Sequence, residues 1–184
     1  MIYDKQNKEA IFASLLSEKL TIILEQETTD KRKDILSFFQ AINSFNFYAV
    51  MGRKNIMLPF LSVQDNLLLG IPKKEKENFL IQINQIIIKF KLNDKSLKQS
   101  ANELSEYEQM IFQIIRALIL KQNIIIFDTS SNQIDTSLFL FNLMPILKSF
   151  TKLNQSTAII VTSNNDLANS NYYDQCILLD SLFK

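Results

Sequence analysis

The sequence predicts an α/β domain built around a mainly parallel sheet. Two features of the 184-residue chain carry this prediction. Short apolar runs of strand length alternate with longer segments whose apolar residues recur at helical spacing, which is the order typical of α/β folds. In addition, runs such as NIIIFD at 123–128 show no alternation of apolar and polar residues, as expected for parallel strands buried on both faces. No linker or repeat interrupts the chain, so a single domain over 1–184 is expected.

Each predicted strand is a short, mostly apolar run bounded by polar residues. Apart from the second, all are apolar enough to be buried strands. The expected strands lie at 20–25, 46–51, 123–128, 156–163 and 175–180.

The predicted helices occupy much of the chain between these strands, at 33–42, 73–92, 105–120 and 137–150. The third has a defined start, because Ser105 followed by Glu108 forms a capping box ahead of a long apolar stretch. The fourth contains Pro145, where we expect a kink because proline lacks a backbone donor and clashes with the preceding turn.

Composition excludes several classes of protein. With 20 basic and 19 acidic residues the formal net charge is +1, so no strong field favours nucleic acid or an anionic membrane as a partner. The chain has no histidine, which removes a common zinc ligand and the usual near-neutral general base. The single cysteine, Cys176, excludes an internal disulfide, and neither a signal peptide nor a membrane-spanning apolar run is seen. We therefore expect a cytoplasmic protein without a metal site.

The segment 104–135, LSEYEQMIFQIIRALILKQNIIIFDTSSNQID, resembles part of the ATP-binding cassette (ABC) ATPase domain of membrane transporters. In that family a signature of the form LSGGEQ opens a helix. It is followed by an R-A-L segment, then by four hydrophobic residues and the pair D-E, and then by a loop that ends in L-D. The stretch MLPFLSVQDNLLLG at 57–70 resembles the wording after the Q-loop of macrolide-exporter and lipoprotein-release cassettes. The resemblance implies a P-loop NTPase-like sheet core with a helical arm at roughly 66–103. It also implies loss of most of the antiparallel β-subdomain, because little chain separates Lys31 from Met51.

The resemblance places a phosphate loop directly after the first strand, but the glycines of that loop are missing. The family form is GxxGxGK[ST], and the matching segment here has Lys31 at the lysine position with Glu25, Thr28 and Asp30 in place of glycines. Such a loop holds phosphate with inward-pointing backbone N–H groups, in conformations with positive φ that glycine adopts freely. Arg32 stands where the family has the Mg²⁺-binding hydroxyl. We therefore expect neither ATP nor Mg²⁺ to bind well.

The other positions that the resemblance assigns to nucleotide have also changed. Ser105 of the signature is retained, but Glu106 and Tyr107 replace two glycines and would oppose a phosphate by charge and by bulk. Asp128 is retained, whereas Thr129 occupies the position of the catalytic glutamate and cannot act as a general base.

The position of the family's switch histidine is occupied by Ser163, and 51–53 lacks the glutamine of the Q-loop. We therefore expect no ATPase activity and no catalytic residue. The retained residues also have a structural explanation, since Ser105 suffices as a helix cap and Asp128 can cap the turn after its strand.

The resemblance implies a catalytically inactive ABC-type subunit, a scaffold or regulator of a membrane transport or peptide-export complex. The helical arm and 51–70 would form a groove for the coupling helix of a polytopic permease, at the cytoplasmic face of the membrane. A second ABC ATPase subunit or another copy of the chain is a further expected partner, with Asp135 as candidate dimer contact. Two alternatives stay open: a slow ATPase using Lys31, Asp128 and a group from a partner, and a free-standing cytosolic protein that binds a peptide or regulator.

Overall fold

The computed structural model describes residues 15, 18–25, 47–51, 57–129, 137 and 139–179, and for 47–51 it describes the backbone. The helix expected at 33–42 lies outside the described residues.

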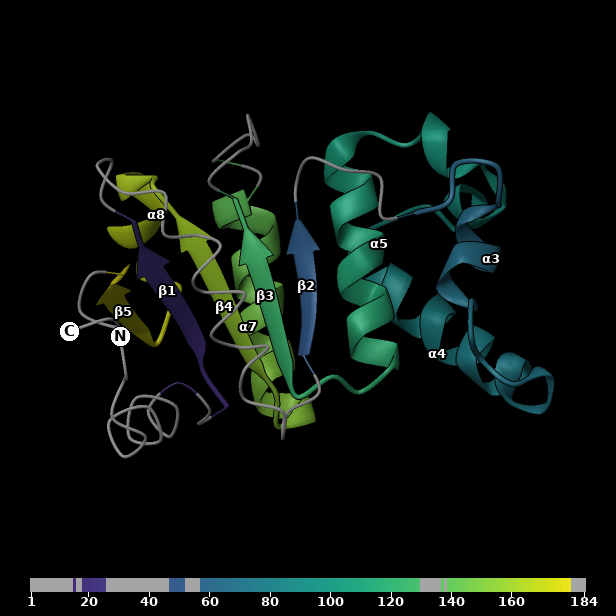
Figure 1. Cartoon of the computed structure of the whole chain (residues 1–184), viewed down its shortest axis with the longest axis horizontal. Helices are drawn as coiled ribbons and strands as arrows, with labels where there is room; N and C mark the ends of the chain where they lie inside the picture. Colours follow the sequence, from purple (N-terminus) through teal and green to yellow (C-terminus); the bar gives the residue numbers. More distant parts are fainter. Residues whose placement is uncertain are drawn as a thin grey trace, which may run out of the picture.

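Five parallel strands form one sheet in the order β2-β3-β4-β1-β5 (Figure 1). The central strands β3 and β4 are almost wholly buried, because apolar residues face both sides of the sheet. This arrangement confirms the predicted α/β class and the parallel sheet. The strands are β1 Leu20–Leu24, β2 Phe47–Met51, β3 Ile124–Asp128, β4 Thr157–Thr162 and β5 Gln175–Leu178.

Strand β5 differs from the expectation of a fully buried strand. Among the described strands it pairs with β1 alone, so it forms an edge of the sheet. Cys176 is exposed and Leu178 is 45% exposed, whereas Gln175 and Ile177 are half-buried. One face of β5 is therefore open to solvent. The sequence QCILLD does not predict this exposure, because its polar and apolar residues do not alternate.

The described α-helices are α3 Val63–Leu67, α4 Lys76–Lys89, α5 Glu106–Ile119, α7 Met144–Asn154 and α8 Asn165–Ala168. The predicted capping box of α5 is confirmed. Ser105 N–H donates to Glu108 Oε2 (2.9 Å), and Glu108 N–H donates to Ser105 Oγ (3.3 Å). Two backbone donors that no intrahelical acceptor could reach are thereby satisfied.

The helix expected to run through Pro145 changes form just before that residue. Phe139–Leu143 is a π-helical turn, and α7 begins at Met144 with Pro145 in its first turn. Proline is tolerated there because the N–H groups of a first turn have no intrahelical acceptor. Helical conformation is continuous over 139–154, so the predicted helix through Pro145 is confirmed there, and a π-helical turn lies directly before α7.

Helices α3, α4 and α5 form an arm beyond the β2 edge of the sheet, as Figure 1 shows. From Met110 to Ile119, every residue of α5 except Arg116 is buried, and this helix packs against α3, α4 and β2. The arm and the sheet therefore share one hydrophobic core. The turn that leaves α3 requires glycine, since the φ of Gly70 is +77°. Among the described residues, no helix has the length and apolar character needed to cross a membrane.

Candidate functional site

The carboxyl ends of β3 and β4 bring three predicted site residues to one edge of the sheet. Asp128 lies in register with Val161 of β4, and Thr129 N–H donates to Val161 O (3.0 Å). Ser163 directly follows β4 at the same edge. Open parallel sheets bind their ligands outside this edge, so the structure places these residues where a nucleotide site would be expected.

Strand β1 adds a buried acidic residue to this edge. Glu25 directly follows β1, and its N–H donates to Thr162 O (2.8 Å). The Glu25 residue is only 5% exposed. A buried acidic side chain therefore stands at the start of the segment that resembles a phosphate loop, at a position where the resemblance expects glycine.

The side chain of Thr129 is engaged in the framework of the sheet. Its Oγ1 donates to Val161 O (3.1 Å), and the residue is half-buried. A neutral hydroxyl used in this way cannot take a proton from water, which a general base must do. Asp128 is half-buried and Ser163 is exposed. Among the described residues, no group of acidic and cysteine side chains is arranged to hold a metal ion.

Three predicted site residues, Lys31, Arg32 and Asp135, lie outside the described part of the chain. The signature residues lie apart from the edge of the sheet near Asp128. They open α5, which begins at the end of the molecule where the strands finish but beyond strand β2 (Figure 1). Ser105 Oγ donates to Glu108 Oε2 (2.7 Å), so this hydroxyl serves the helix cap.

Glu106 and Tyr107 occupy the first turn of α5 in different surroundings. The side chain of Glu106 is exposed, whereas Tyr107 is half-buried, and burial raises the pKa of its hydroxyl. The phenol is therefore neutral at physiological pH. Both residues therefore add side chains to the surface at the start of α5, at the two positions where the resemblance expects glycines.

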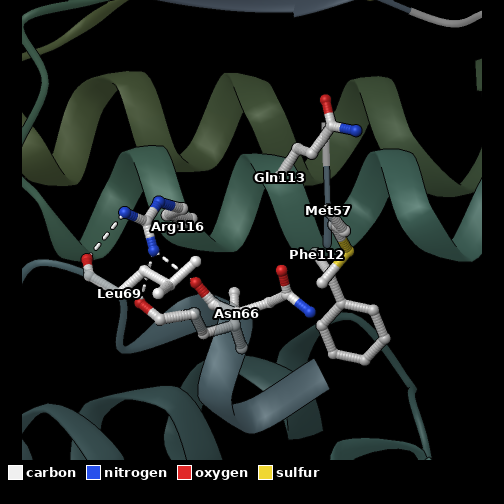
Figure 2. A pocket seen from close by; sticks show the side chains of 7 residues that line it. Met57, Asn66, Leu69, Phe112, Gln113 and Arg116 are labelled. Carbon is white, nitrogen blue, oxygen red and sulfur yellow. Dashed lines mark hydrogen bonds between the residues drawn. The ribbon is translucent and has the colours of Figure 1, made fainter. Parts of the chain in front are cut away.

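A pocket of about 280 Å³ lies between α3 and α5 (Figure 2). The resemblance predicts a groove formed by the arm and residues 51–70, but it does not predict the polar residues that line this pocket. Its lining consists of Met57, Asn66, Leu67, Leu69, Phe112, Gln113 and Arg116.

Asn66 holds one wall of the pocket together. Its Oδ1 accepts Leu58 N–H (2.7 Å), and its Nδ2 donates to Leu58 O (3.0 Å) and to Ser62 O (3.0 Å). The residue is only 4% exposed, so these bonds satisfy an amide that would otherwise be costly to bury. The loop that begins at Met57 is thereby tied to α3.

Arg116 connects this wall to helix α5. Its Nη1 donates to Asn66 O and to Leu67 O (2.9 Å), and its Nη2 donates to Leu69 O (2.8 Å). These carbonyl groups belong to the last turn of α3 and the turn after it, where backbone acceptors lack intrahelical partners. The guanidinium thus holds α3 against α5, as the dashed lines in Figure 2 show.

Gln113 is the unusual residue of the pocket. It is 4% exposed, and its Oε1 is the one buried side-chain polar atom without a hydrogen-bond partner in the described structure. A signal is present in the sequence, because this glutamine interrupts the apolar stretch 110–115 on a helix whose surface there is buried.

Exposed apolar side chains occur in the pocket lining and on the loop that precedes α3. Leu58 and Leu69 are each 39% exposed, and Phe60 is 77% exposed. Leu69 belongs to the lining, while Leu58 and Phe60 lie on the loop that Asn66 ties to α3. Large exposed apolar side chains on one loop and the neighbouring pocket wall are typical of a protein interaction site.

The fold is shared with solved cassette ATPases of ABC transporters. CbiO1 from Clostridium perfringens, described as part of the ABC transporter complex CbiONQ, matches with a TM-score of 0.65 at 15% identity, over 88% of this chain and 73% of its own. The dimeric structure of MJ0796, a bacterial ABC transporter cassette, matches with a TM-score of 0.62 at 17% identity, over 89% of this chain and 82% of its own. These similarities establish the P-loop NTPase-like fold of the sheet and its arm. Comparison with family profiles and with curated protein sequences gives no match.

Proposed function

We propose that this chain is a catalytically inactive ABC-type subunit that docks on a polytopic permease at the cytoplasmic face of a membrane. It acts there as a scaffold or regulator of a transport or peptide-export complex. The observation that carries this proposal is the pocket between α3 and α5 with its exposed apolar side chains. CbiO1, which has the same fold, is described as part of a transporter complex, and this supports a membrane partner.

Catalytic inactivity is supported by the residues at the carboxyl edge of the sheet. Thr129 uses its hydroxyl to bond the backbone of β4, and the buried Glu25 stands where a phosphate loop would begin. Thr28 and Asp30 stand in place of loop glycines, and Arg32 stands in place of the Mg²⁺-binding hydroxyl. We therefore propose that neither ATP nor Mg²⁺ is a working cofactor.

Docking through the arm is supported by its construction. Asn66 and Arg116 fix the segment 57–69 against α5 with side-chain hydrogen bonds that span both sides of the pocket. Phe60 projects from this fixed segment with 77% of its surface exposed. A rigid concave surface with an exposed aromatic residue suits insertion of a short helix from a permease. A second ABC subunit, or another copy of this chain, would join through a surface that includes Asp135.

A pull-down tests the proposal. Tagged protein is recovered from detergent-solubilised membranes of the source cells, and its partners are identified by mass spectrometry. We expect a polytopic permease, and we expect Phe60→Ser to reduce its recovery by about tenfold, as for loss of a buried aromatic anchor. Ile88→Ser is the matched control, because Ile88 is equally exposed at 76% but lies on α4 outside the pocket. A partner list without membrane proteins would instead favour a free-standing binding protein.

The alternative of a slow ATPase is tested with two further substitutions. Lys31→Ala and Asp128→Asn are compared with wild type for ATP turnover in the recovered complex. Our proposal expects no change from either substitution, whereas a fall in turnover with both would support a composite site that uses these residues.

A further inference from the structure

The amino ends of the five parallel strands lie together at one edge of the sheet, opposite the edge that holds Asp128. Helices α5 and α7 also end at this edge, because each leads directly into the start of a strand (Figure 1). Helix α4 ends beside α7, since the ring of Phe90 stacks on that of Phe150 with 5.6 Å between their centroids. These strand starts and helix ends form one surface, the amino edge.

Lysine side chains collect at the amino edge. Each of the three helices that end there contributes at least one, and a further lysine directly precedes β1. The lysines are Lys19, Lys89, Lys91, Lys121, Lys148 and Lys152. Lys91, Lys121 and Lys152 are exposed, and each stands at the end of a different helix or just after it.

Few acidic residues oppose these lysines in the described part of the chain. Asp174 is paired with Lys148 (3.2 Å), and Glu18 is exposed. The other five lysines form no ion pair with any residue that the structure describes. Six lysines and two acidic residues give the described amino edge a net charge of +4, which Asp94 and Lys95 in the next turn leave unchanged. The net charge of +1 for the whole chain therefore understates the local charge of this surface.

Lysine near the end of a helix also has a local role, because the last carbonyl groups carry a partial negative charge. That role accounts for Lys89 and Lys152, which lie in the last turns of α4 and α7. Lys91 and Lys121 lie beyond the last turn, with φ of +56° and +50°. Gln155 has the same conformation after α7, with φ of +52°, so the backbone there does not require a charged residue. The charges of Lys91 and Lys121 are thus available to a partner.

The side chains of the amino edge indicate the chemistry of that partner. Its described cations are all lysines, which act as flexible point charges and do not form the bidentate pairs that arginine makes with phosphate. The aromatic side chains nearby pack on the core: Phe90 and Phe150 are buried, and Tyr172 and Tyr173 are half-buried. They offer no exposed platform on which nucleic-acid bases could stack. A flexible chain of carboxylates fits such a surface better than a nucleic acid.

We infer that the amino edge binds an acidic segment of a protein partner, rich in aspartate and glutamate. The carboxylates of the segment lie along the ends of α4, α5 and α7 and meet Lys91, Lys121 and Lys152. This surface is separate from the pocket between α3 and α5, so the inference does not rest on docking to a permease.

The test uses a fluorescently labelled oligoglutamate of about ten residues, which reaches roughly 34 Å when extended, enough to cross the roughly 15 Å from β1 to β2. Its binding to the full chain is followed by fluorescence anisotropy at low ionic strength. We expect binding that weakens as salt is added, because exposed charges are screened. No binding of oligoglutamate, binding that salt does not change, or tighter binding of an oligouridylate of equal charge would each overturn the inference.

Two triple variants assign the binding to the amino edge. Lys91→Gln, Lys121→Gln and Lys152→Gln together are expected to lower the affinity about tenfold, since each exposed ion pair contributes modestly. The matched control replaces Lys73, Lys74 and Lys76 with glutamine. These exposed lysines lie at the other end of α4, roughly 20 Å from Lys89, and their loss is expected to change the affinity less than about twofold.

Equal losses of affinity in the two triple variants would overturn the inference, because they would show that net charge alone decides binding. Thermal melting checks that both variants are folded. If the amino-edge variant is unfolded, Lys152→Gln alone is compared with Lys76→Gln alone. Lys152→Gln must then lower the affinity about twofold more than Lys76→Gln, and equal effects would count against the inference. These outcomes do not depend on which protein the pull-down recovers.

Discussion

At the scale of single residues, Gln113 shows how the pocket differs from the core around it. The helix α5 buries nearly all of its side chains from Met110 onward, yet this glutamine places an amide oxygen among them without a donor. An unpaired buried polar group costs roughly 1–3 kcal/mol. A buried polar group without a partner requires an explanation, and the proposed docking function supplies one because Gln113 lies in the pocket wall.

Gln113→Met is therefore expected to raise the free energy of unfolding by about 1 kcal/mol, because methionine fills similar space without the unpaired oxygen. Urea denaturation at neutral pH measures the change. Gln85→Met on the exposed face of α4 is the control and is expected to alter stability by less than about 0.5 kcal/mol. A loss of stability in Gln113→Met would show that the amide oxygen has a partner in solution.

At the scale of elements, Asp174, which directly precedes β5, connects strand β1 to helix α7. Its Oδ2 accepts Leu20 N–H (3.0 Å) at the start of β1, and its Oδ1 pairs with Lys148 of α7 (3.2 Å). Burial alone would raise the pKa of this carboxyl, but the hydrogen bond from Leu20 and the charge of Lys148 outweigh it, so the pKa is lowered. The carboxylate thus helps to hold β1, β5 and α7 together.

The lowered pKa of Asp174 predicts a specific loss of stability in acid. Because the pKa in the folded state lies below that of the unfolded chain, the contribution is fully present above about pH 4 and is lost as the pH falls through the lower, folded-state pKa. Asp174→Asn is expected to be less stable than wild type at pH 7, and the difference is expected to shrink in acid. Urea midpoints across this range measure it, and a difference that stays constant with pH would refute the assignment.

Elements also differ in how far the sequence predicts them. The apolar runs of β3 and β4 and the capping box of α5 are local signals, and the structure confirms them. The exposed face of β5 depends on its place at the sheet edge, which no local pattern encodes. The bonds of Arg116 to the last turn of α3 join residues about fifty positions apart, so the pocket could be expected by resemblance but not built from the sequence. Its glutamine was visible only as one polar residue within an apolar helix.

At the scale of the whole molecule, a cassette-like fold is combined with a sheet edge that carries Thr129 and the buried Glu25. The fold matches solved cassettes with TM-scores of 0.65 and 0.62. At the sheet edge, the Thr129 hydroxyl bonds the backbone of β4, and Glu25 is buried. A fold can be retained for the surface that it presents while its original site loses function. In our proposal the retained surface is the arm, whose pocket is held by Asn66 and Arg116.

Millimolar MgATP is accordingly expected to leave the melting temperature unchanged. A ligand present at a hundred times its dissociation constant stabilises a folded protein by about 2.7 kcal/mol, which a thermal-shift measurement detects readily. Magnesium chloride and sodium sulfate at matched ionic strength are the controls. A rise seen only with MgATP, and abolished by Lys31→Ala, would show that the degenerate loop still binds nucleotide.

Photo-crosslinking from the pocket region in intact cells tests the central claim most directly. A photoreactive phenylalanine analogue replaces Phe60 in one strain and Ile88 in another, since these side chains are 77% and 76% exposed in different parts of the arm. Docking through the pocket predicts a crosslink from position 60 to a polytopic membrane protein and little from position 88. Equal yields from both positions, or crosslinks from position 60 to soluble proteins alone, would contradict it.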